Sequence, residues 1–333
     1  MAVSSPTFLP IRSNPAAPLR VAVVGAGVMG RRHARVLASR PDRFALTGIV
    51  DLDAAVAREV AEAHGAPMLA REVEAIAGAE AVIVATPTAA HALTVQCALA
   101  CGRHVLVEKP VAARAQDASE LVRLSNAGGA RLFVGHSERF NPVVRALARL
   151  VEASEIRALE LRRVGARSGS PAAATEGALV NLGVHDLDLA SYLTRSPLSL
   201  ASSVGELGAG GREERAQVLG RTGSGAALHI LVDQRAGAVR RRTVVLLTAR
   251  HAWHGDLLAP SLVRVCRTTG AREAIPLDTE EPLLAQALAF AAAVRGGATH
   301  EIATGFDGAR ALLAAERAAR RLRDAARPAA ATP

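Results

Sequence analysis

The chain has few aromatic residues and no long apolar run, and both absences limit what it can be. Aromatic side chains make up only 2% of its 333 residues, and no aromatic-rich RNA-binding pattern is present. No apolar stretch reaches the length that spans a bilayer, so we expect no membrane partner. Residues 1–19 contain four prolines but no continuous apolar core, which argues against a signal peptide and predicts a flexible tail.

Cysteine is also scarce. The three residues Cys97, Cys101 and Cys266 are too few for a disulfide framework, and we therefore expect a cytoplasmic protein. Cys97 and Cys101 lie four residues apart in a segment that we expect to be helical, but no further ligand residues complete a metal site. We expect two small buried side chains there and no bound metal.

Lysine is the rarest charged residue, because Lys109 is the only one among 40 basic residues and all the others are arginine. The net charge of +9 raises the possibility of a nucleic-acid partner. The arginines are scattered, however, with the longest run at 240–242, and no zinc-finger spacing accompanies them. We expect no nucleic-acid partner and interpret the charge as a basic surface that attracts an anionic small molecule.

Strand and helix patterns alternate in the first part of the chain. A β-branched run at 21–24 comes first, and further segments follow in strand–helix order: strands at 44–51, 79–87, 104–110 and 131–136, and helices at 54–65, 89–102 and 118–129. Such alternation predicts βαβ crossovers and a doubly wound parallel sheet.

The pattern changes after residue 136. A helix is expected around 141–153, then a strand at 156–165, a loop of small residues at 166–176 and a helix at 182–194. Strand-like segments without intervening helices fill 198–275, which favours an antiparallel or mixed sheet, and helices at 283–297 and 307–327 close the chain. The fold class is therefore α/β, with a Rossmann-type domain followed by a second α/β domain.

A dinucleotide-binding fingerprint follows the first strand. Gly25, Gly27 and Gly30 form G-x-G-x-x-G around Val28 and Met29, and they stand between a strand and a helix. The first glycine allows a tight turn, the second lets a pyrophosphate approach the backbone, and the third lets helix and strand pack closely. The pyrophosphate is expected at the N-terminus of the helix.

An acidic residue stands where this fingerprint requires one. Asp51 ends the next expected strand, 21 residues beyond Gly30, and is suited to accept hydrogen bonds from ribose hydroxyls. Its charge disfavours a 2′-phosphate, and Leu52 follows it instead of an arginine, although Arg31 and Arg32 stand at the helix start. We therefore expect NAD rather than NADP.

Several further motifs resemble the Gfo/Idh/MocA family of sugar and inositol oxidoreductases. They are "VAVVGAGVMGRRHARVL", "VATPTAAH", "HVLVEKPVA", "GHSERFNPVV" and "GALVNLGVHDLDLASYL", in the family's order and spacing over roughly 20–323. The resemblance implies a Rossmann domain at 20–135 and a substrate-binding domain at 136–306 with a large open, mostly antiparallel sheet that often serves oligomerisation. It further implies that the helix at 307–325 packs back on the Rossmann domain and that the protein is a homo-oligomer, a dimer or a tetramer.

The resemblance also assigns cofactor residues. It implies that Thr86, Pro87 and Thr88 pass beside the adenosine and ribose. His91 is expected near the pyrophosphate or nicotinamide, with a local helix cap as the alternative. Glu108 and Pro110 resemble the residues that shape the turn at the nicotinamide, the proline through a cis bond.

Lys109 is the residue that the chemistry singles out. Oxidation of a secondary alcohol needs a base for the hydroxyl proton, and Lys109 ends a parallel strand, where open α/β sheets bind ligands. An ammonium beside a positively charged nicotinamide loses its proton more readily, whereas arginine keeps its proton in proteins. This difference explains why a chain that otherwise uses arginine has a lysine here.

The remaining candidates follow in the second domain. His185 matches the family's catalytic histidine, and either it or Lys109 could take the proton. Asn181 stands four residues earlier, where many family members have Asp, so it can orient a substrate but carries no charge. Asp186 is a candidate substrate contact or a helix-supporting residue. Arg139 and Asn141 of "ERFNP" are candidate substrate contacts, with a structural turn as the alternative.

These residues predict a dehydrogenase. Within the family, "GHSERFNP" is most similar to the sugar-nucleotide 3-dehydrogenases, so we expect oxidation at C3 of a sugar nucleotide such as UDP-N-acetylglucosamine. An inositol or free-sugar dehydrogenase is the alternative on the same scaffold. A non-catalytic NAD(H)-binding regulator is a third possibility, for which Asn181 is the only sequence indication.

Overall fold

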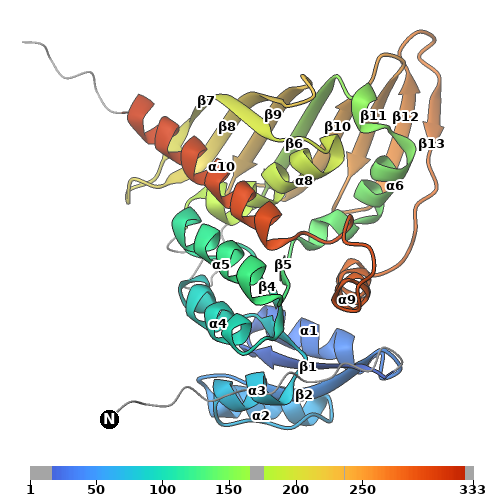
Figure 1. Ribbon diagram of the computed structural model, residues 1–333. Helices are drawn as coiled ribbons and strands as arrows, with labels where there is room; N and C mark the ends of the chain where they lie inside the picture. Colours follow the sequence, from blue (N-terminus) through green and yellow to red (C-terminus); the bar gives the residue numbers. More distant parts are fainter. Residues whose placement is uncertain (1–16, 166–175, 236, 327–333) are drawn as a thin grey trace, which may run out of the picture. The chain divides into compact units, whose positions relative to one another are not determined.

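The computed structural model describes residues 17–165, 176–235 and 237–326 and divides into two compact units (Figure 1). The first unit comprises the described residues up to His136 together with Leu283–Ala309, and the second comprises Ser137–Pro282 and the residues from Arg310 onward. Most of the tail expected at 1–19 and nearly all of the loop expected at 166–176 lie outside the described residues.

The first unit contains a five-stranded sheet of order β2-β1-β3-β4-β5, and every strand pair in it is parallel. Strand and helix alternate along the chain as expected. The elements are β1 (Leu19–Val24), α1 (Val28–Ala38), β2 (Phe44–Val50), α2 (Ala54–Ala63), α3 (Glu72–Gly78), β3 (Ala81–Val84), α4 (Thr88–Ala100), β4 (His104–Val107), α5 (Ala115–Gly128), β5 (Leu132–Val134) and α9 (Pro282–Val294).

Burial explains why these short runs become central strands. All four residues of β3 are fully buried, as expected for a parallel sheet that is covered on both faces. The helix α3 was not expected, because its seven residues bury only Ala75 and Ile76 and carry too little periodicity to recognise. The expectation of buried cysteines was wrong for Cys97, which is exposed on α4, while Cys101 is half-buried.

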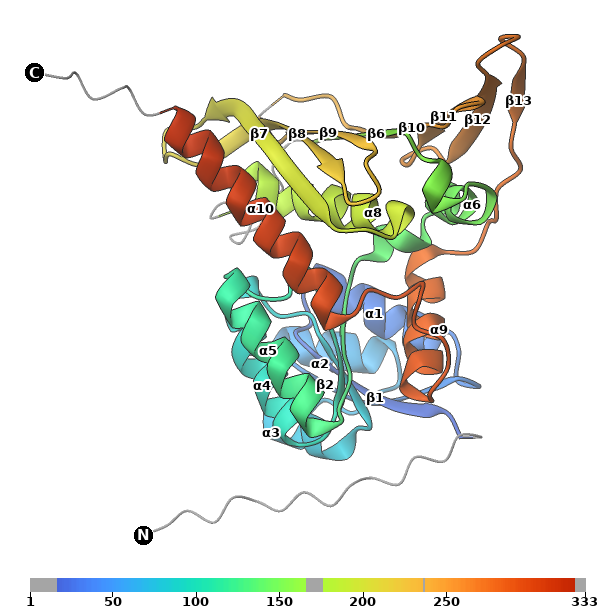
Figure 2. The same ribbon diagram turned by 45° about the horizontal axis from the view of Figure 1, so that its top comes forward.

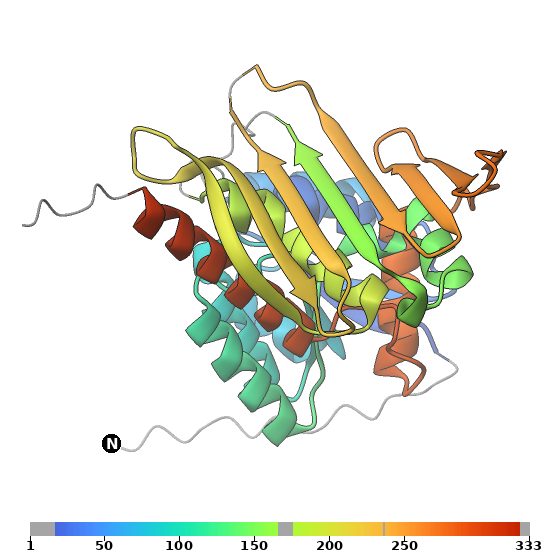
Figure 3. The ribbon, with the colours of Figure 1, turned by 90° about the horizontal axis from the view of Figure 1, so that it is seen from above.

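The second unit contains an eight-stranded sheet of order β13-β12-β11-β10-β6-β9-β8-β7 (Figure 3). All its strand pairs are antiparallel except β6–β9, so the predicted mostly antiparallel sheet is confirmed. The strands are β6 (Ala158–Val164), β7 (Leu198–Leu207), β8 (Glu213–Thr222), β9 (Ala227–Asp233), β10 (Arg241–Leu247), β11 (His251–Asp256), β12 (Ser261–Cys266) and β13 (Arg272–Ala274).

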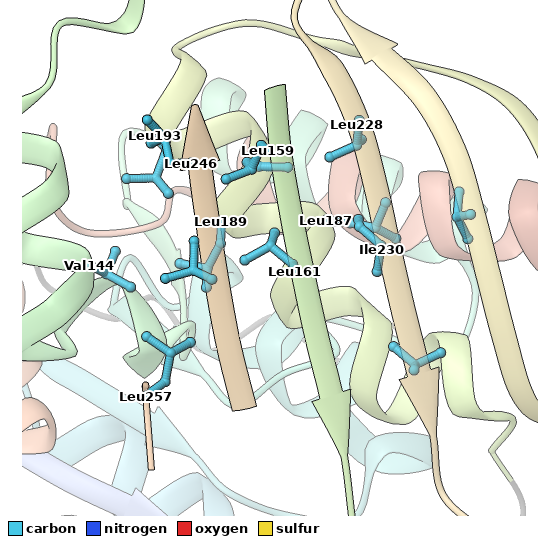
Figure 4. Close-up of a cluster of buried hydrophobic side chains, with 14 of the residues drawn as sticks. Val144, Leu159, Leu161, Leu187, Leu189, Leu193, Leu228, Ile230, Leu246 and Leu257 are labelled. Carbon is cyan, nitrogen blue, oxygen red and sulfur yellow. The ribbon is translucent and has the colours of Figure 1, made fainter. Parts of the chain in front are cut away.

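Helices cover one face of this sheet, and the core lies between them and the strands. Leu159 and Leu161 of β6 point toward Leu187, Leu189 and other apolar residues of α8 (Figure 4). The intervening residues of β6 are half-buried, so the strand alternates with period two. The helical elements are η1 (Ser137–Phe140), α6 (Pro142–Leu150), η2 (Ala153–Glu155), η3 (Leu179–Gly183), α8 (Val184–Thr194) and α10 (Gly305–Ala325).

The last helix, α10, is divided between the two units, and the packing of residues 307–325 back on the Rossmann domain stays a prediction. Its start belongs to the first unit, where a Cβ on Gly308 would lie 2.5 Å from the side chain of Val134. The rest belongs to the second unit, and α10 runs beside β7 (Figure 2). The reason is an alanine-rich face, since Ala315, Ala318 and Leu322 are buried in the core of that unit.

No helix in the described part of the chain is long and apolar enough to cross a membrane.

Candidate active site

The carboxyl ends of the parallel strands bring the predicted cofactor residues of the first unit to one edge. Val24 of β1 pairs in register with Val84 of β3, which pairs with Val107 of β4, which pairs with Val134 of β5. The loops that follow these strands therefore start side by side. β2 lies on one side of β1 and β3 lies on the other, so the direction in which successive strands are added reverses at β1. Open α/β sheets bind ligands at such a switch point.

Gly25 and Gly30 are required by the backbone of the fingerprint loop. Gly25 has a φ of +94°, and a Cβ there would lie 2.5 Å from the carbonyl carbon of Ala85. A Cβ on Gly30 would lie 1.8 Å from the carbonyl oxygen of Gly25. Gly27 differs from both, because a Cβ there would have no described atom within 4 Å. The backbone at Gly27 thus faces open space, as the approach of a pyrophosphate requires.

The N-terminus of α1 is suited to an anion. Gly27 is its N-cap residue, no side-chain hydrogen bond caps it among the described residues, and its first turn contains no acidic residue. The first N–H groups, at Val28, Met29 and Gly30, thus have no acidic side chain in their own turn and form the positive end of the helix dipole.

Asp51 holds the fingerprint loop in place. One carboxylate oxygen accepts a hydrogen bond from the backbone N–H of Ala26 at 2.6 Å, and the other accepts one from Asp53 at 3.0 Å. A carboxylate has four lone-pair sites, so these contacts are compatible with the predicted bonds to ribose hydroxyls. Arg31, which could have met a phosphate, instead pairs with Glu59 through two hydrogen bonds of 2.6 and 2.8 Å.

The residues after β3 fit the edge of such a cofactor site. Thr86 is half-buried, and its hydroxyl is buried without a hydrogen-bond partner among the described residues. Pro87 is the N-cap residue of α4, and Thr88 is the first residue of that helix. Together with the open backbone at Gly27 and the uncapped end of α1, these features show that the residues present fit a dinucleotide.

His91 is buried and links two loops of this edge. Its Nδ1 lies 2.8 Å from the carbonyl oxygen of Pro110, and its Nε2 lies 2.9 Å from that of Thr86. The ring therefore connects the loop after β3 with the loop after β4. Both ring nitrogens are directed at protein carbonyl groups, and the expected position of His91 near the cofactor stays a prediction.

Lys109 follows β4 and is half-buried. The Lys109–Pro110 peptide is cis, as the resemblance implied. The preceding residue, Glu108, is buried, and its carboxylate lies 2.7 Å from Nε2 of His33. Burial by itself would raise the pKa of Glu108, but the hydrogen bond and charge of His33 and the charge of Lys109 lower it below its usual value.

Sequence reasoning missed His33, which is almost fully buried on α1. The available signal was its position three residues after Gly30, on the helix face that must pack against the sheet. Its partner Glu108 lies 75 residues away in the chain, so no local pattern could have paired them.

In the second unit, Asn181 and His185 lie on a local distortion of the helix. Residues Leu179–Gly183 form a π-helical turn that leads directly into α8, and such turns frequently occur at functional sites. Asn181 and His185 are both half-buried. The side-chain amide of Asn181 donates a hydrogen bond of 3.0 Å to Gln234, which sequence reasoning also missed.

Arg139 and Asn141 both make contacts within the protein, while a contact with substrate stays a prediction. Arg139 is buried, donates hydrogen bonds of 2.8 and 2.6 Å to Asp188, and lies over the ring of Tyr192. Asn141 caps α6 by accepting a bond from the N–H of Val143, and its amide donates to a backbone carbonyl at 3.0 Å. The alternative interpretation, a structural turn, describes both residues.

Asp186 belongs to a buried internal charge network, as the interpretation of a helix-supporting residue requires. Arg163 of β6 donates to both oxygens of Asp186 at 3.0 Å and also donates to Glu138 at 2.9 Å. Arg242 of β10 donates to the same oxygen of Glu138 at 2.7 Å. Burial alone would raise the pKa of Glu138, but the charges of Arg163 and Arg242 lower it. A buried charge needs such partners, so the network fixes α8 against η1 and the sheet.

No group of three or more His, Cys, Asp or Glu side chains within the described ranges is arranged to hold a metal ion.

Two family models match this chain. The oxidoreductase family Gfo/Idh/MocA, with an NAD-binding Rossmann fold, matches residues 19–136, and the C-terminal domain of the same family matches residues 148–251. The two matches together span more than half of the chain and include parts of both units.

Relatives and solved structures agree with these models. Inositol 2-dehydrogenase from Rhizobium meliloti (strain 1021) is 26% identical over 230 residues, which cover 66% of this chain and 69% of that protein. UDP-N-acetylglucosamine 3-dehydrogenase from Acidithiobacillus ferrooxidans is 30% identical over 176 residues, which cover 53% of this chain and only 54% of that protein.

A solved structure of UDP-N-acetylglucosamine 3-dehydrogenase from Acidithiobacillus ferrooxidans superposes with a TM-score of 0.84. The superposition covers 92% of this chain and 98% of that one at 24% identity, so it supports the fold. With the fingerprint loop and both domain models in place, the chain belongs to the Gfo/Idh/MocA family of oxidoreductases.

Proposed function

We propose that the protein is an NAD-dependent dehydrogenase that oxidises the C3 hydroxyl of a sugar nucleotide, UDP-N-acetylglucosamine, to a 3-keto sugar. One observation carries this proposal: the single lysine of the chain stands at the same sheet edge as the glycine-rich loop. At this edge it can meet both a nicotinamide, which accepts the hydride from the substrate carbon, and the substrate hydroxyl, which gives up a proton.

NAD, when bound, supplies the hydride acceptor. The first unit binds it through the open backbone at Gly27, the N-terminus of α1 and the ribose contact of Asp51. The preference for NAD over NADP rests on the Asp51 carboxylate, which repels a 2′-phosphate, and on the pairing of Arg31 with Glu59.

Lys109 is the proposed base that removes the hydroxyl proton. Its neighbours support this role, since the buried pair of Glu108 and His33 fixes the backbone from which the lysine extends. Arginine in the same place would supply a positive charge but could not accept a proton. His185 is the proposed second acid–base group, and Asn181 orients the substrate beside it from the π-helical turn.

The choice of a sugar nucleotide rests on the similarity to UDP-N-acetylglucosamine 3-dehydrogenase and on the motif "GHSERFNP". The match to inositol 2-dehydrogenase supports inositol as the second candidate substrate. Assembly into a homo-oligomer through the open sheet face of the second unit is part of the same proposal, as is a cytoplasmic location.

The test is turnover by the purified protein with NAD⁺ and a panel of UDP-sugars, free sugars and inositols, followed by NADH absorbance. We expect turnover with UDP-N-acetylglucosamine. Turnover with inositol alone would establish the second candidate instead, and tight NAD⁺ binding without turnover of any substrate would indicate a regulator.

The Lys109→Arg variant tests the proposed base. We expect unchanged NAD⁺ binding and a kcat lower by about 10²–10⁴-fold, the usual contribution of general acid–base catalysis. Arg123→Lys, the reverse exchange at an exposed site paired with Glu120, is the matched control and should keep full activity. An active Lys109→Arg enzyme would refute the proposed role.

A further inference from the structure

Gln234 is a buried amide that stands next to the π-helical turn. It follows β9 and is only 1% exposed, and its backbone N–H donates a 2.8 Å hydrogen bond to Glu214. Its side-chain Nε2 donates to the backbone carbonyl oxygen of Glu176 at 3.3 Å, and its Oε1 accepts from Nδ2 of Asn181 at 3.0 Å. The Gln234 side chain therefore bridges a fixed carbonyl group and a candidate substrate residue.

These contacts determine the orientation of both amides. A backbone carbonyl oxygen only accepts hydrogen bonds, so the NH₂ group of Gln234 must face Glu176 and its oxygen must face Asn181. Asn181 in turn must present its NH₂ group to Gln234. Its Oδ1 is consequently the atom directed away from Gln234, and an amide oxygen only accepts hydrogen bonds.

The Glu176 carbonyl is itself held in place. The carboxyl group of Glu213, a buried residue, lies over the next residue, where a Cβ on Gly177 would come within 2.2 Å of it. The backbone N–H of Asn181 donates to the carbonyl oxygen of Gly177 at 2.9 Å. The chain of hydrogen bonds thus begins and ends on the same short segment of backbone.

We propose that Gln234 is a positioning residue that fixes Asn181 as an uncharged hydrogen-bond acceptor for a hydroxyl or amide N–H of the substrate. The inference rests on the proposed function, in which the π-helical turn meets the substrate. It explains why an uncharged amide suits position 181: a carboxylate there would face the oxygen of Gln234, and two acceptors repel each other. Proton transfer then falls to other groups than residue 181.

A double-mutant cycle on stability tests the pairing without substrate. Asn181→Asp and Gln234→Met are made singly and together, and their unfolding midpoints are compared. We expect Asn181→Asp to lower the midpoint in the wild-type background. The same Asn181→Asp substitution should lower the unfolding midpoint clearly less in the Gln234→Met background, where the methionine side chain has no oxygen to oppose the carboxylate. Additive effects, or an Asn181→Asp variant as stable as the wild type, would overturn the proposal.

Gln234→Glu is a second variant in case Gln234→Met does not fold. The Glu side chain keeps an acceptor opposite position 181. Asn181→Asp should therefore lower the unfolding midpoint more in this background than in the wild type. An equal cost in both backgrounds would also overturn the proposed pairing.

Kinetics then tests what the pairing does. We expect Gln234→Met to lower kcat/KM about tenfold while NAD⁺ binding stays unchanged, and Gln217→Met, a half-buried change on β8, to leave both unchanged. Unchanged kcat/KM in a folded Gln234→Met enzyme would refute the positioning role. A wild-type protein without turnover on any substrate, but with a non-additive stability cycle, would refute the proposed function and leave the pairing intact.

Discussion

The two units hold their candidate residues by different means. In the first unit, the fingerprint site is built mainly from backbone: a glycine with positive φ, a glycine under a carbonyl oxygen and an uncapped helix end. In the second unit, the helix that carries His185 is fixed by buried side-chain charges from β6 and η1. A site built from backbone depends on the absence of side chains, whereas a site built from charges depends on every partner being present.

The largest expected effect comes from adding one carbon atom to the first site. Gly30→Ala would place a Cβ 1.8 Å from the carbonyl oxygen of Gly25, and no side-chain rotation can relieve a clash between backbone-fixed atoms. We expect a loss of more than about 3 kcal/mol of stability, at or beyond the upper range for overpacking. Circular dichroism and denaturant unfolding measure it.

Gly27→Ala is the matched comparison, because its Cβ would meet no described atom within 4 Å. This variant should fold normally but bind NAD⁺ at least about tenfold more weakly, a difference of about 1.4 kcal/mol. If Gly27→Ala bound NAD⁺ as tightly as the wild type, the assignment of the pyrophosphate to this loop would be wrong.

The charge network of the second unit should be nearly as sensitive. Arg163→Met leaves Asp186 and Glu138 buried without their shared partner, and we expect a loss of about 3–5 kcal/mol in denaturant unfolding. Arg162→Met, on the neighbouring position of β6, removes only an exposed pair with Glu160 and should cost less than about 1 kcal/mol. An equal loss of stability in Arg163→Met and Arg162→Met would contradict the conclusion that the second unit depends on its buried charges.

A smaller effect is expected from Glu108, which pairs with His33 in the first unit and is buried there. Its pKa is lowered in the folded protein, so its stabilisation is complete above its ordinary pKa of about 4.3 and is lost as the pH falls through the lower folded value. Glu108→Gln should cost about 1.5–3 kcal/mol at neutral pH, the range for a hydrogen bond to a charged group. The free energy of unfolding, measured from neutral to acidic pH, should fall more steeply for the wild type than for this variant.

The smallest effect is expected from Arg31. Its pair with Glu59 is exposed, so Arg31→Ala should leave stability and NAD⁺ affinity almost unchanged when measured by melting and by titration. A large loss of NADP⁺ binding in this variant would contradict the proposed cofactor preference, because it would mean that Arg31 leaves Glu59 to meet a phosphate.

The features that sequence predicted are those with a local signal. The order of strands and helices, the parallel sheet and the fingerprint loop all follow from short-range patterns, because a glycine or an apolar period acts on its own neighbourhood. The partners of Arg139 and Asp186 could not be predicted from such local patterns. Their partners lie 49 and 23 residues away, and an arginine in a motif looks the same whether it meets a substrate or a buried carboxylate.

The same limit applies to Gln234 and to the second sheet. Gln234 carries no motif, and only the fold brings it beside Asn181, 53 residues earlier. The one parallel pair in the sheet, β6 with β9, joins strands that are separated by α8 and two further strands. Strand propensity indicates that these segments pair but not with which partner, since pairing depends on the packing of whole faces.

The scarcity of lysine has a practical consequence for Lys109. Arginine does not react with amine-selective acylating reagents under conditions that modify an ε-amine, and Lys109 carries the only side-chain primary amine of the sequence. A single mass increment then reports on one position at a sheet edge, without mutation and without interference from the rest of the surface. The composition of this chain thus supplies a selective labelling site at the residue on which its proposed chemistry depends.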